Sequence, residues 1–500
     1  MFPRREPGAV LRQRLPSARY VRIIGANNFL RAPVMDQSLI FDSQLIKRYD
    51  TSGPRYTSYP TAVQFHKGFG EAEYRHAAQI TNEQSRASDH ARPLSLYFHL
   101  PFCDTVCFYC GCNKIVTKNR QRAVPYLEHL YKEIAMQGAL FDRHRPVDQL
   151  HWGGGTPTFI SHEQMRDLMR VTRKHFQLRD DDSGEYSIEI DPREADEKTV
   201  RLLRELGFNR MSMGVQDFEP DVQKAVNRIQ SEEQTFTVLD AARQQGFKSV
   251  SIDLIYGLPL QSVASFGRTL DKILAVLPDR LSVFNYAHLP EMFKTQRQIK
   301  DAELPSAQEK LDILSHTIDK LTHAGYVYIG MDHFARPDDE LASAQRNGTL
   351  YRNFQGYSTH ADCDLVAMGV TSIGMVGNTY AQNVKDLDTY YARIDAGQLP
   401  VYRGIELNAD DLLRREVITQ LICHFRLDIP AIEARFGIVF ADYFAVELPK
   451  LGQMQTDGLL TLNAQRIEVL PAGHLLIRNV CMVFDKYLRA QTLQRFSKVI

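Results

Sequence analysis

The stretch HLPFCDTVCFYCGCNK, residues 99–114, contains four of the chain's seven cysteines: Cys103, Cys107, Cys110 and Cys112. Disulfides, a zinc ion, a redox pair or an iron–sulfur cluster could each explain such crowding. Cys110 and Cys112 are separated by one residue, an awkward span for an unstrained disulfide. Seven cysteines in 500 residues also do not resemble a secreted disulfide framework. Cysteine usage therefore favours reduced thiols in a cytoplasmic protein.

The spacing of the four thiols separates the remaining alternatives. Structural zinc usually takes paired cysteine knuckles that lie a dozen or more residues apart, and here all four thiols share one short segment. A catalytic CxxC pair would need a thioredoxin-like context, which the segment lacks. Iron–sulfur clusters take closely spaced thiolates from single loops. A cluster is therefore the favoured interpretation, and zinc stays as the alternative.

Composition indicates a water-soluble globular protein without a polyelectrolyte partner. Hydrophobic residues make up 44% and charged residues 24%. No apolar run approaches the roughly 20 residues that span a bilayer. Lys+Arg and Asp+Glu balance at 60 each, so the chain has no bias toward nucleic acid. We therefore expect neither a nucleic-acid nor a membrane partner.

Short apolar runs alternate with amphipathic segments from residue 94 onward. The alternation predicts βα units on a parallel sheet, and right-handed crossovers would curl six of them into a partial barrel. The expected fold class is therefore α/β, a partial (β/α)6 barrel. The runs with strand character are 94–100, 149–155, 186–191, 210–216, 249–257 and 281–289. The helical segments between them include 125–140, 163–176, 233–247 and 265–277.

Chemistry in such barrels lies at the C-terminal ends of the strands. The cysteine segment follows the first strand and a glycine run follows the second, while Glu189, Gln216, Asp253 and Ala287 lie at or near the ends of the next four. A single polar residue at a strand end is more often a loop cap. Several of them at one barrel mouth predict a site.

The chain is expected to have five parts. Residues 1–34 carry seven arginines, no lysine and a single acid, which is typical of a transit peptide; the favoured explanation is a disordered leader or a misassigned start, with translation beginning at Met35. Residues 35–93 form an N-terminal arm and 94–300 the barrel. Residues 301–400 are a barrel extension with substrate-side loops, and 401–500 a helical C-terminal domain.

The last two parts have their own patterns. Residues 307–326 predict a helix, 327–335 a strand and 336–362 a long loop. The C-terminal part predicts helices followed by a β-hairpin and a last helix, which is winged-helix-like. No concentrated basic helix is present, so a packing or lid role is favoured over DNA binding. The predicted C-terminal elements are helices at 410–425, 429–436 and 441–451, and the hairpin with its helix at 457–484.

The spacing Cys103-x3-Cys107-x2-Cys110, with Tyr109 before the third cysteine, resembles the signature of the radical S-adenosylmethionine (SAM) superfamily. Longer blocks resemble the oxygen-independent coproporphyrinogen III oxidases. These blocks include SGPRYTSYPTA (52–62), PLSLYFHLPFC (93–103), CGCNKIVT (110–117), LHWGGGTPT (150–158), IEIDPRE (188–194), FNRMSMGVQDF (208–218), IDLIYGLP (252–259), DRLSVFNYAHLP (279–290), GMDHFARPDDELA (330–342) and RNFQGYSTH (352–360).

The resemblance implies a [4Fe-4S] cluster on Cys103, Cys107 and Cys110, with Cys112 not a ligand, and S-adenosyl-L-methionine on the open iron. Tyr109 stands where some relatives have phenylalanine. Glycine would let backbone groups approach the ligand closely. The positions that match SAM contacts of the family are Tyr97, Tyr109, Gly154, Gly155, Thr156, Glu189, Gln216, Arg228, Asp253, Ala287 and Ile373.

The implied reaction converts two propionate side chains of coproporphyrinogen III to vinyl groups, giving protoporphyrinogen IX for haem biosynthesis. A 5′-deoxyadenosyl radical would remove a hydrogen from each propionate. The resemblance also implies a monomer that takes electrons from a low-potential donor. The alternatives are a related haem chaperone, which lacks the CGC extension and RNFQGYST, and a winged-helix regulator with a cluster sensor.

Arginines are expected to hold the acidic substrate, because a guanidinium binds carboxylates in a bidentate manner. Candidates are Arg55, Arg336 and Arg352, with Phe354 and Gln355 beside the last. Each could equally bind loop carbonyls or water.

Overall fold

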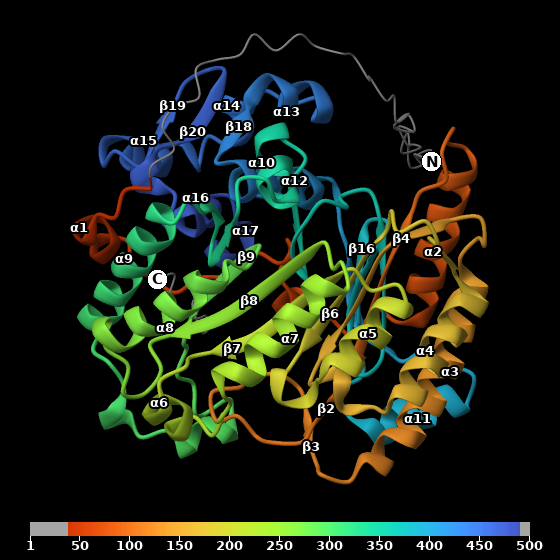
Figure 1. Cartoon of the computed structure of the whole chain (residues 1–500). Coiled ribbons are helices and arrows are strands. Elements are labelled where there is room, and N and C mark those ends of the chain that lie inside the picture. The colour runs from red at the N-terminus through yellow and green to blue at the C-terminus, as the bar shows by residue number, and fades with distance from the viewer. Residues whose placement is uncertain (1–38, 491–500) are drawn as a thin grey trace, which may run out of the picture. The chain divides into compact units, whose positions relative to one another are not determined.

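Six parallel strands form the centre of the main sheet (Figure 1), and their order in the sheet is their order in the chain. Parallel pairing joins each strand to the next. The computed structural model describes residues 39–490, so the predicted leader lies outside the described residues. The six strands are β1 (Leu94–Leu100), β4 (Pro146–Gly154), β6 (Glu185–Ile190), β7 (Arg210–Gln216), β8 (Ser249–Tyr256) and β9 (Arg280–Asn285).

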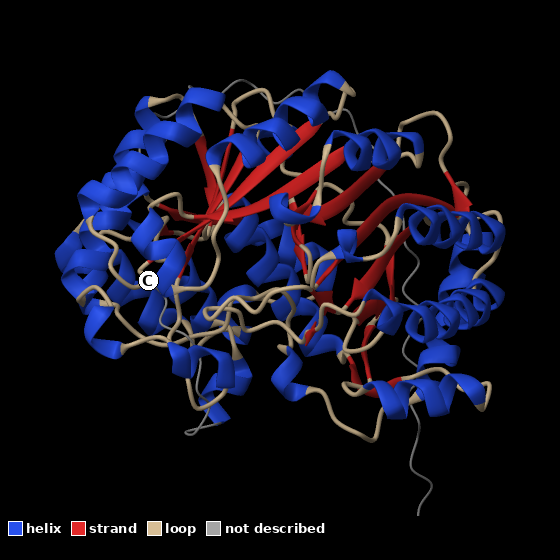
Figure 2. Ribbon diagram, turned by 60° about the horizontal axis from the view of Figure 1, so that its bottom comes forward, coloured by secondary structure: helices blue, strands red, loops and turns tan. Residues whose placement is uncertain are grey.

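Helices follow these strands and cover one face of the sheet (Figure 2). Their apolar stripes are buried; in α3, for example, Leu127, Leu130 and Ile134 have almost no exposed surface. Ser161 begins α4 with a capping box, in which its hydroxyl accepts from the backbone N–H of Gln164. The predicted α/β partial barrel is confirmed. The helices are α3 (Ala123–Leu140), α4 (His162–His175), α5 (Glu197–Glu205), α7 (Glu232–Gln244), α8 (Val263–Val276) and α9 (Ala307–His323).

The sheet continues beyond both outer strands of the barrel. The barrel extension was predicted for residues 301–400, with one strand at 327–335, but the strands beyond β1 were not predicted. On one side β14 (Asp364–Met368) pairs parallel with β1, and β15 (Ile373–Val376), β16 (Thr379–Asn383) and β17 (Val401–Glu406) follow antiparallel. On the other side β11 (His333–Ala335) pairs antiparallel with β9.

Two predictions for residues 327–362 were wrong. The single strand expected at 327–335 is two antiparallel strands, β10 (Val327–Gly330) and β11, because the chain reverses at Met331, whose φ is +56°. The long loop expected at 336–362 contains regular structure, since hairpin pairing and tertiary contacts override its polar composition. It contains α10 (Glu340–Asn347), β12 (Tyr351–Asn353) and β13 (Gly356–Ser358).

The C-terminal part contains the predicted run of helices, the predicted β-hairpin and the last helix. A short strand at Arg426–Asp428, which was not predicted, pairs antiparallel with this hairpin. One predicted helix, 441–451, is two, because Pro449 is tolerated only in a first helical turn and there begins a new helix. Within residues 39–490, no helix is long and apolar enough to cross a membrane. The elements are α12 (Ala409–His424), β18 (Arg426–Asp428), α13 (Ile429–Phe436), α14 (Phe440–Tyr443), α15 (Leu448–Thr456), β19 (Leu460–Leu462), β20 (Arg466–Val469) and α16 (Ile477–Val483).

A buried carboxyl on α3 joins this helix to the added strands. Glu133 accepts hydrogen bonds from the Gly369 N–H (2.8 Å), the Tyr390 hydroxyl (2.6 Å) and the Asn383 amide (2.9 Å). Burial raises the pKa of Glu133 to about 7, although these bonds oppose the shift. The folded chain therefore holds this proton up to about pH 7, whereas the unfolded chain loses it near pH 4.5.

We expect the free energy of unfolding of Glu133→Gln to increase progressively relative to that of wild type as pH rises from about 5 to 7.5. The unfolded state binds fewer protons in this window, so ionisation of Glu133 destabilises the wild type by about 2 kcal/mol across it. The check is the difference in urea unfolding midpoint between variant and wild type. The exposed carboxyl of Glu128, on the same helix, provides the control. A pH-independent difference for Glu133→Gln would contradict the prediction.

Candidate active site

The inner face of the parallel sheet is lined by side chains that remain partly accessible. Along β8, Ser251, Asp253 and Ile255 are half-buried, whereas the residues between them are buried. The same alternation places Ser187 and Glu189 of β6 on this face. The Glu189 side chain is 46% exposed although its strand is central in the sheet. Solvent therefore reaches the inner face of the sheet at these residues; the accessible space beside them is called the hollow below.

The cysteine loop lies at the C-terminal end of β1 and is anchored to the loops that follow β7 and β9. The Gln296 amide donates to the carbonyls of both Tyr109 (2.9 Å) and Ala287 (3.2 Å). The Asn227 amide donates to the Val106 carbonyl at 2.7 Å. Gln296 thus brings together two residues that the sequence predicted for the site. Gln296, in a short 3-10 helix (Lys294–Gln298), was missed because an isolated glutamine carries no sequence signal.

The sulfur atoms of the three predicted ligands each accept a hydrogen bond. Thr156 Oγ1 lies 3.7 Å from Cys103 Sγ, and the backbone N–H of Cys112 donates to Cys110 Sγ at 3.4 Å. Arg228 Nη1 lies 3.5 Å from Cys107 Sγ. Donors at all three sulfurs fit thiolate ligands of a cluster. The backbone N–H of Cys112 thus supplies one of these donors.

The acidity of these thiols differs with their surroundings. The hydrogen bond from the Cys112 side chain and the charge of Lys114 lower the pKa of Cys110 below its ordinary value, against the effect of burial. Burial raises the pKa of Cys103 to about 11. Among residues 39–490, no three His, Cys, Asp or Glu side chains converge as ligands of one metal ion. A four-iron cluster takes one thiolate per iron, so its ligands need not converge on a single point.

The glycine run at the end of β4 lets two strand ends approach closely. A Cβ at Gly154, whose φ is +114°, would lie 2.6 Å from His99 Nδ1, and one at Gly155 would lie 2.6 Å from the Phe102 carbonyl. The Gly155 N–H donates to the carbonyl of Leu100 at the end of β1 (2.8 Å), and the Thr156 N–H donates to the carbonyl of Phe102, two residues later (2.7 Å). The missing Cβ atoms of Gly154 and Gly155 therefore leave room for neighbouring protein atoms. The N–H groups of Gly155 and Thr156 are both used in hydrogen bonds and do not point free into the hollow.

Glu189 is held as a carboxylate beside this run. It accepts from the Gly154 N–H at 3.0 Å and lies 3.3 Å from His151 Nε2. Partial desolvation by the surrounding protein opposes ionisation, but the hydrogen bond and charge of His151 keep the pKa of Glu189 below its ordinary value. Tyr97 stacks on His151 with ring centroids 5.8 Å apart. His151 was missed by the sequence analysis, although it lies on the same strand face as Gly153.

Arg228 and Gln216 meet at the end of β7. Arg228 is buried and donates to Asp191 at 3.0 Å and to the Gly214 carbonyl. A Cβ at Gly214 would lie 2.8 Å from Gln216 Nε2 and 3.3 Å from Arg228 Nη2. Within the described part of the chain, Arg228 Nε has no partner. This unpartnered donor fits the carboxylate of a bound small molecule. Asp253 faces the same hollow.

Two further predicted residues can be placed. Burial raises the pKa of Asp253 to about 6, while the Ser212 hydroxyl donates to it at 3.0 Å. Ile373, at the start of β15, packs with Tyr97 against one small apolar cluster. The predicted residues therefore come from strands on both sides of β1 and from the loops after them.

Comparison with known proteins agrees with this geometry. The Radical SAM superfamily model matches residues 97–273, and the HemN C-terminal domain model matches 407–476. An oxygen-independent coproporphyrinogen III oxidase of Pseudomonas aeruginosa is 55% identical over 466 residues, covering 93% of this chain and 100% of the relative. The chain belongs to the oxygen-independent coproporphyrinogen III oxidase family. The Escherichia coli K12 member is 53% identical over 465 residues, covering 93% of this chain and 99% of the relative.

A solved structure agrees with this family membership. It is described as coproporphyrinogen III oxidase (HemN) from Escherichia coli, a radical SAM enzyme. It matches with a TM-score of 0.85 and 51% identity, and the match covers 90% of this chain and 100% of that one.

The three arginines proposed for an oxidase substrate have different surroundings. Arg55 pairs with Asp332. Arg336 lies beside Asp279, where β9 begins, and so at the edge of the sheet away from the cysteine loop. Arg352 is 7% exposed, and its Nε and Nη1 have no partner among the residues described. Arg352 is therefore the arginine that most needs an acidic partner.

Two polar side chains near Arg352, His333 and Gln355, also have buried atoms without a hydrogen-bond partner among the described residues. Burial and the charge of Arg352 lower the pKa of His333 to about 3, so His333 is neutral. His333 Nδ1 and Gln355 Nε2 also find no partner within residues 39–490. The Tyr357 ring contacts both neighbours, 4.7 Å from the Arg352 guanidinium carbon and 5.2 Å from the His333 ring.

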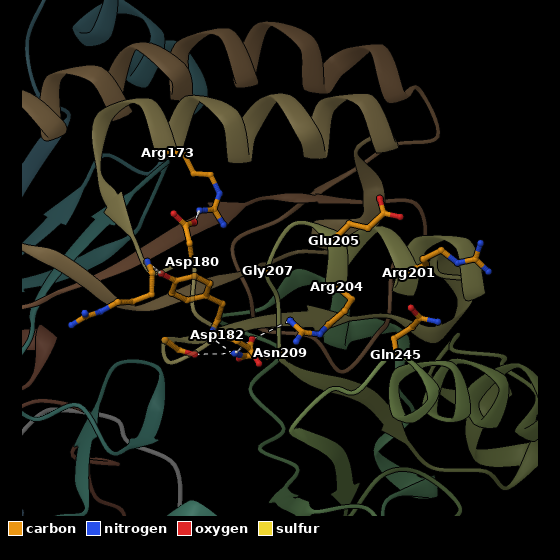
Figure 3. Close-up of a pocket in the computed structure, with 12 residues that line it drawn as sticks. Arg173, Asp180, Asp182, Arg201, Arg204, Glu205, Gly207, Asn209 and Gln245 are labelled. Carbon is orange, nitrogen blue, oxygen red and sulfur yellow. Dashed lines mark hydrogen bonds and ion pairs between the residues drawn. The ribbon is translucent and has the colours of Figure 1, made fainter.

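A cavity of about 550 Å³ lies at the other end of the strands (Figure 3). Its lining includes Gly184 and Asn209, which precede β6 and β7. Arg204 lies 3.1 Å from Asp182, and Arg173 reaches toward Asp180. None of the predicted cluster or SAM positions lines this cavity, so it is separate from the candidate active site.

Proposed function

We propose that this chain converts two propionate side chains of coproporphyrinogen III to vinyl groups by oxidative decarboxylation, giving protoporphyrinogen IX. The observation that carries the proposal is the loop with Cys103, Cys107 and Cys110, each sulfur hydrogen-bonded, at the mouth of an accessible barrel hollow. The family supplies the reaction and the substrate.

The three cysteines hold a [4Fe-4S] cluster, and the residues around them orient S-adenosylmethionine. When bound, this pair supplies a 5′-deoxyadenosyl radical that removes a hydrogen atom from the substrate. The Glu189 carboxylate could bind the ammonium group of S-adenosylmethionine, and Arg228 Nε could donate to its carboxylate. The Gln296 amide keeps Tyr109 and Ala287 at the mouth. Tyr97, Gly154, Gly155, Thr156, Gln216, Asp253 and Ile373 complete the proposed contacts.

The neighbourhood of Arg352 is proposed to receive a substrate carboxylate. Arg55 and Arg352 both contribute positive charge near His333, and Asp332 offsets one of them. Burial makes an unpaired guanidinium unfavourable, so an acidic ligand would gain from entering here. The protein is further proposed to act as a cytoplasmic monomer with a low-potential electron donor; its seven unpaired cysteines, all within the described residues, support a reducing compartment.

The test is anaerobic incubation of the reconstituted protein with SAM, reductant and coproporphyrinogen III, followed by product analysis. Protoporphyrinogen IX and released CO2 are expected, and both should require SAM. A Cys107→Ser variant is the matched control. The haem-chaperone alternative is not favoured, because relatives with 53–55% identity are named as oxidases and the chain carries CGC and RNFQGYST. Haem transfer without decarboxylation would reverse this conclusion.

A further inference from the structure

Two guanidinium groups converge on one sulfur atom of the cysteine loop. Arg228 Nη1 lies 3.5 Å from Cys107 Sγ, and Arg193 Nη2 lies 3.7 Å from the same atom. Arg193 comes from the turn after β6, whereas Arg228 comes from the segment after α6 (Pro220–Ala225). Two elements distant in the sequence therefore direct cationic donors at Cys107.

One carboxylate holds both guanidinium groups in place. Asp191 accepts from Arg193 Nε at 3.0 Å and Nη2 at 2.7 Å, and from Arg228 Nη1 at 3.0 Å. The Asp191 side chain is only 9% exposed, so solvent screens these contacts weakly. Asp191 also accepts from the backbone N–H of Arg193 at 3.1 Å, which fixes the turn itself. The donors at Cys107 are therefore preorganised.

Hydrogen bonds to cluster sulfurs set reduction potential. One-electron reduction adds one negative charge to the cluster, and a nearby positive donor stabilises the added charge. We propose that Asp191 and Arg193 tune the cluster: Arg193, oriented by Asp191, donates to the Cys107 sulfur and raises the reduction potential. The inference rests on the proposed assignment of Cys107 as a cluster ligand. Arg193 acts through Cys107 and is a positioning residue.

The test is an anaerobic redox titration of the reconstituted full chain with dithionite as the one-electron source, followed by EPR of the reduced cluster. Arg193→Met should lower the ratio of reduced to oxidised cluster at a fixed potential about tenfold, which equals about 59 mV for one electron. Arg193→Lys keeps the charge but loses the planar fork that spans Asp191 and the sulfur, so it should shift the potential in the same direction. Arg122→Met removes an exposed positive charge that contacts no cysteine sulfur and should leave the potential unchanged.

An unshifted potential in Arg193→Met, or an equal shift in Arg122→Met, would overturn the inference. Iron loss with a normal potential in the remaining cluster would also overturn it, since it would show a role in loop structure alone. If Arg193→Met cannot hold a cluster, the reduction potential of the cluster in Arg193→Lys provides the test. A wild-type chain without a reducible cluster would instead overturn the proposed function.

Discussion

Cys103→Ser, Cys107→Ser and Cys110→Ser are each expected to abolish product formation and to reduce bound iron. Three thiolates hold a cluster whose fourth iron stays open, so loss of one thiolate exposes a second iron. We expect iron content to fall at least on the order of tenfold, because even residues that only support a metal ligand commonly contribute that much. Iron and sulfide per chain after anaerobic reconstitution provide the measurement.

Cys112→Ser is the matched control for the three ligand variants. Cys112 lies in the same loop, and its backbone N–H donates to Cys110 Sγ at 3.4 Å, a donor that serine retains. This variant should keep most of its iron. Equal iron loss in all four variants, or zinc in the anaerobically purified protein, would remove the three-ligand hypothesis.

Arg352→Lys is expected to lower kcat/KM for coproporphyrinogen about tenfold to a hundredfold, with iron content and SAM binding intact. A charged hydrogen bond in a buried place contributes about 1.5–3 kcal/mol, and lysine cannot reproduce the bidentate geometry of arginine. Steady-state kinetics under anaerobic conditions, with SAM held saturating, provide the measurement. The effect should appear in substrate use because, among the described residues, the side-chain donors to Cys103 and Cys107 are Thr156, Arg193 and Arg228, not Arg352.

Arg336→Lys is the control, since Arg336 is 41% exposed, pairs with Asp338 and lies where β9 begins. Its kinetics should match wild type. Arg352 also contacts the Tyr357 ring, so the melting temperature of each variant must be compared. Wild-type kinetics in both Arg352→Lys and Arg352→Ala would show that the substrate carboxylates are held elsewhere.

Local sequence patterns were sufficient to predict the barrel and to identify the cysteine loop. The six parallel strands follow apolar runs bounded by glycine or polar residues, and period-two alternation carried Glu189 and Asp253 to one face. Likewise, the x3–x2 cysteine spacing lies within one loop, so no long-range contact was needed to detect it. Chemistry that depends on neighbours in sequence is visible in the sequence.

Contacts between distant segments were decided only by the tertiary structure. Gln296 reaches the cysteine loop, Asp191 joins Arg193 to Arg228, and Glu133 binds Gly369 across more than two hundred residues. The choice among three similar arginines also depended on burial, which separated Arg352 from the others. Sequence alone determined the fold class, the family and the cluster motif. Donor geometry, burial and pKa arise from groups that meet only after folding, because electrostatic interactions depend on distance in space.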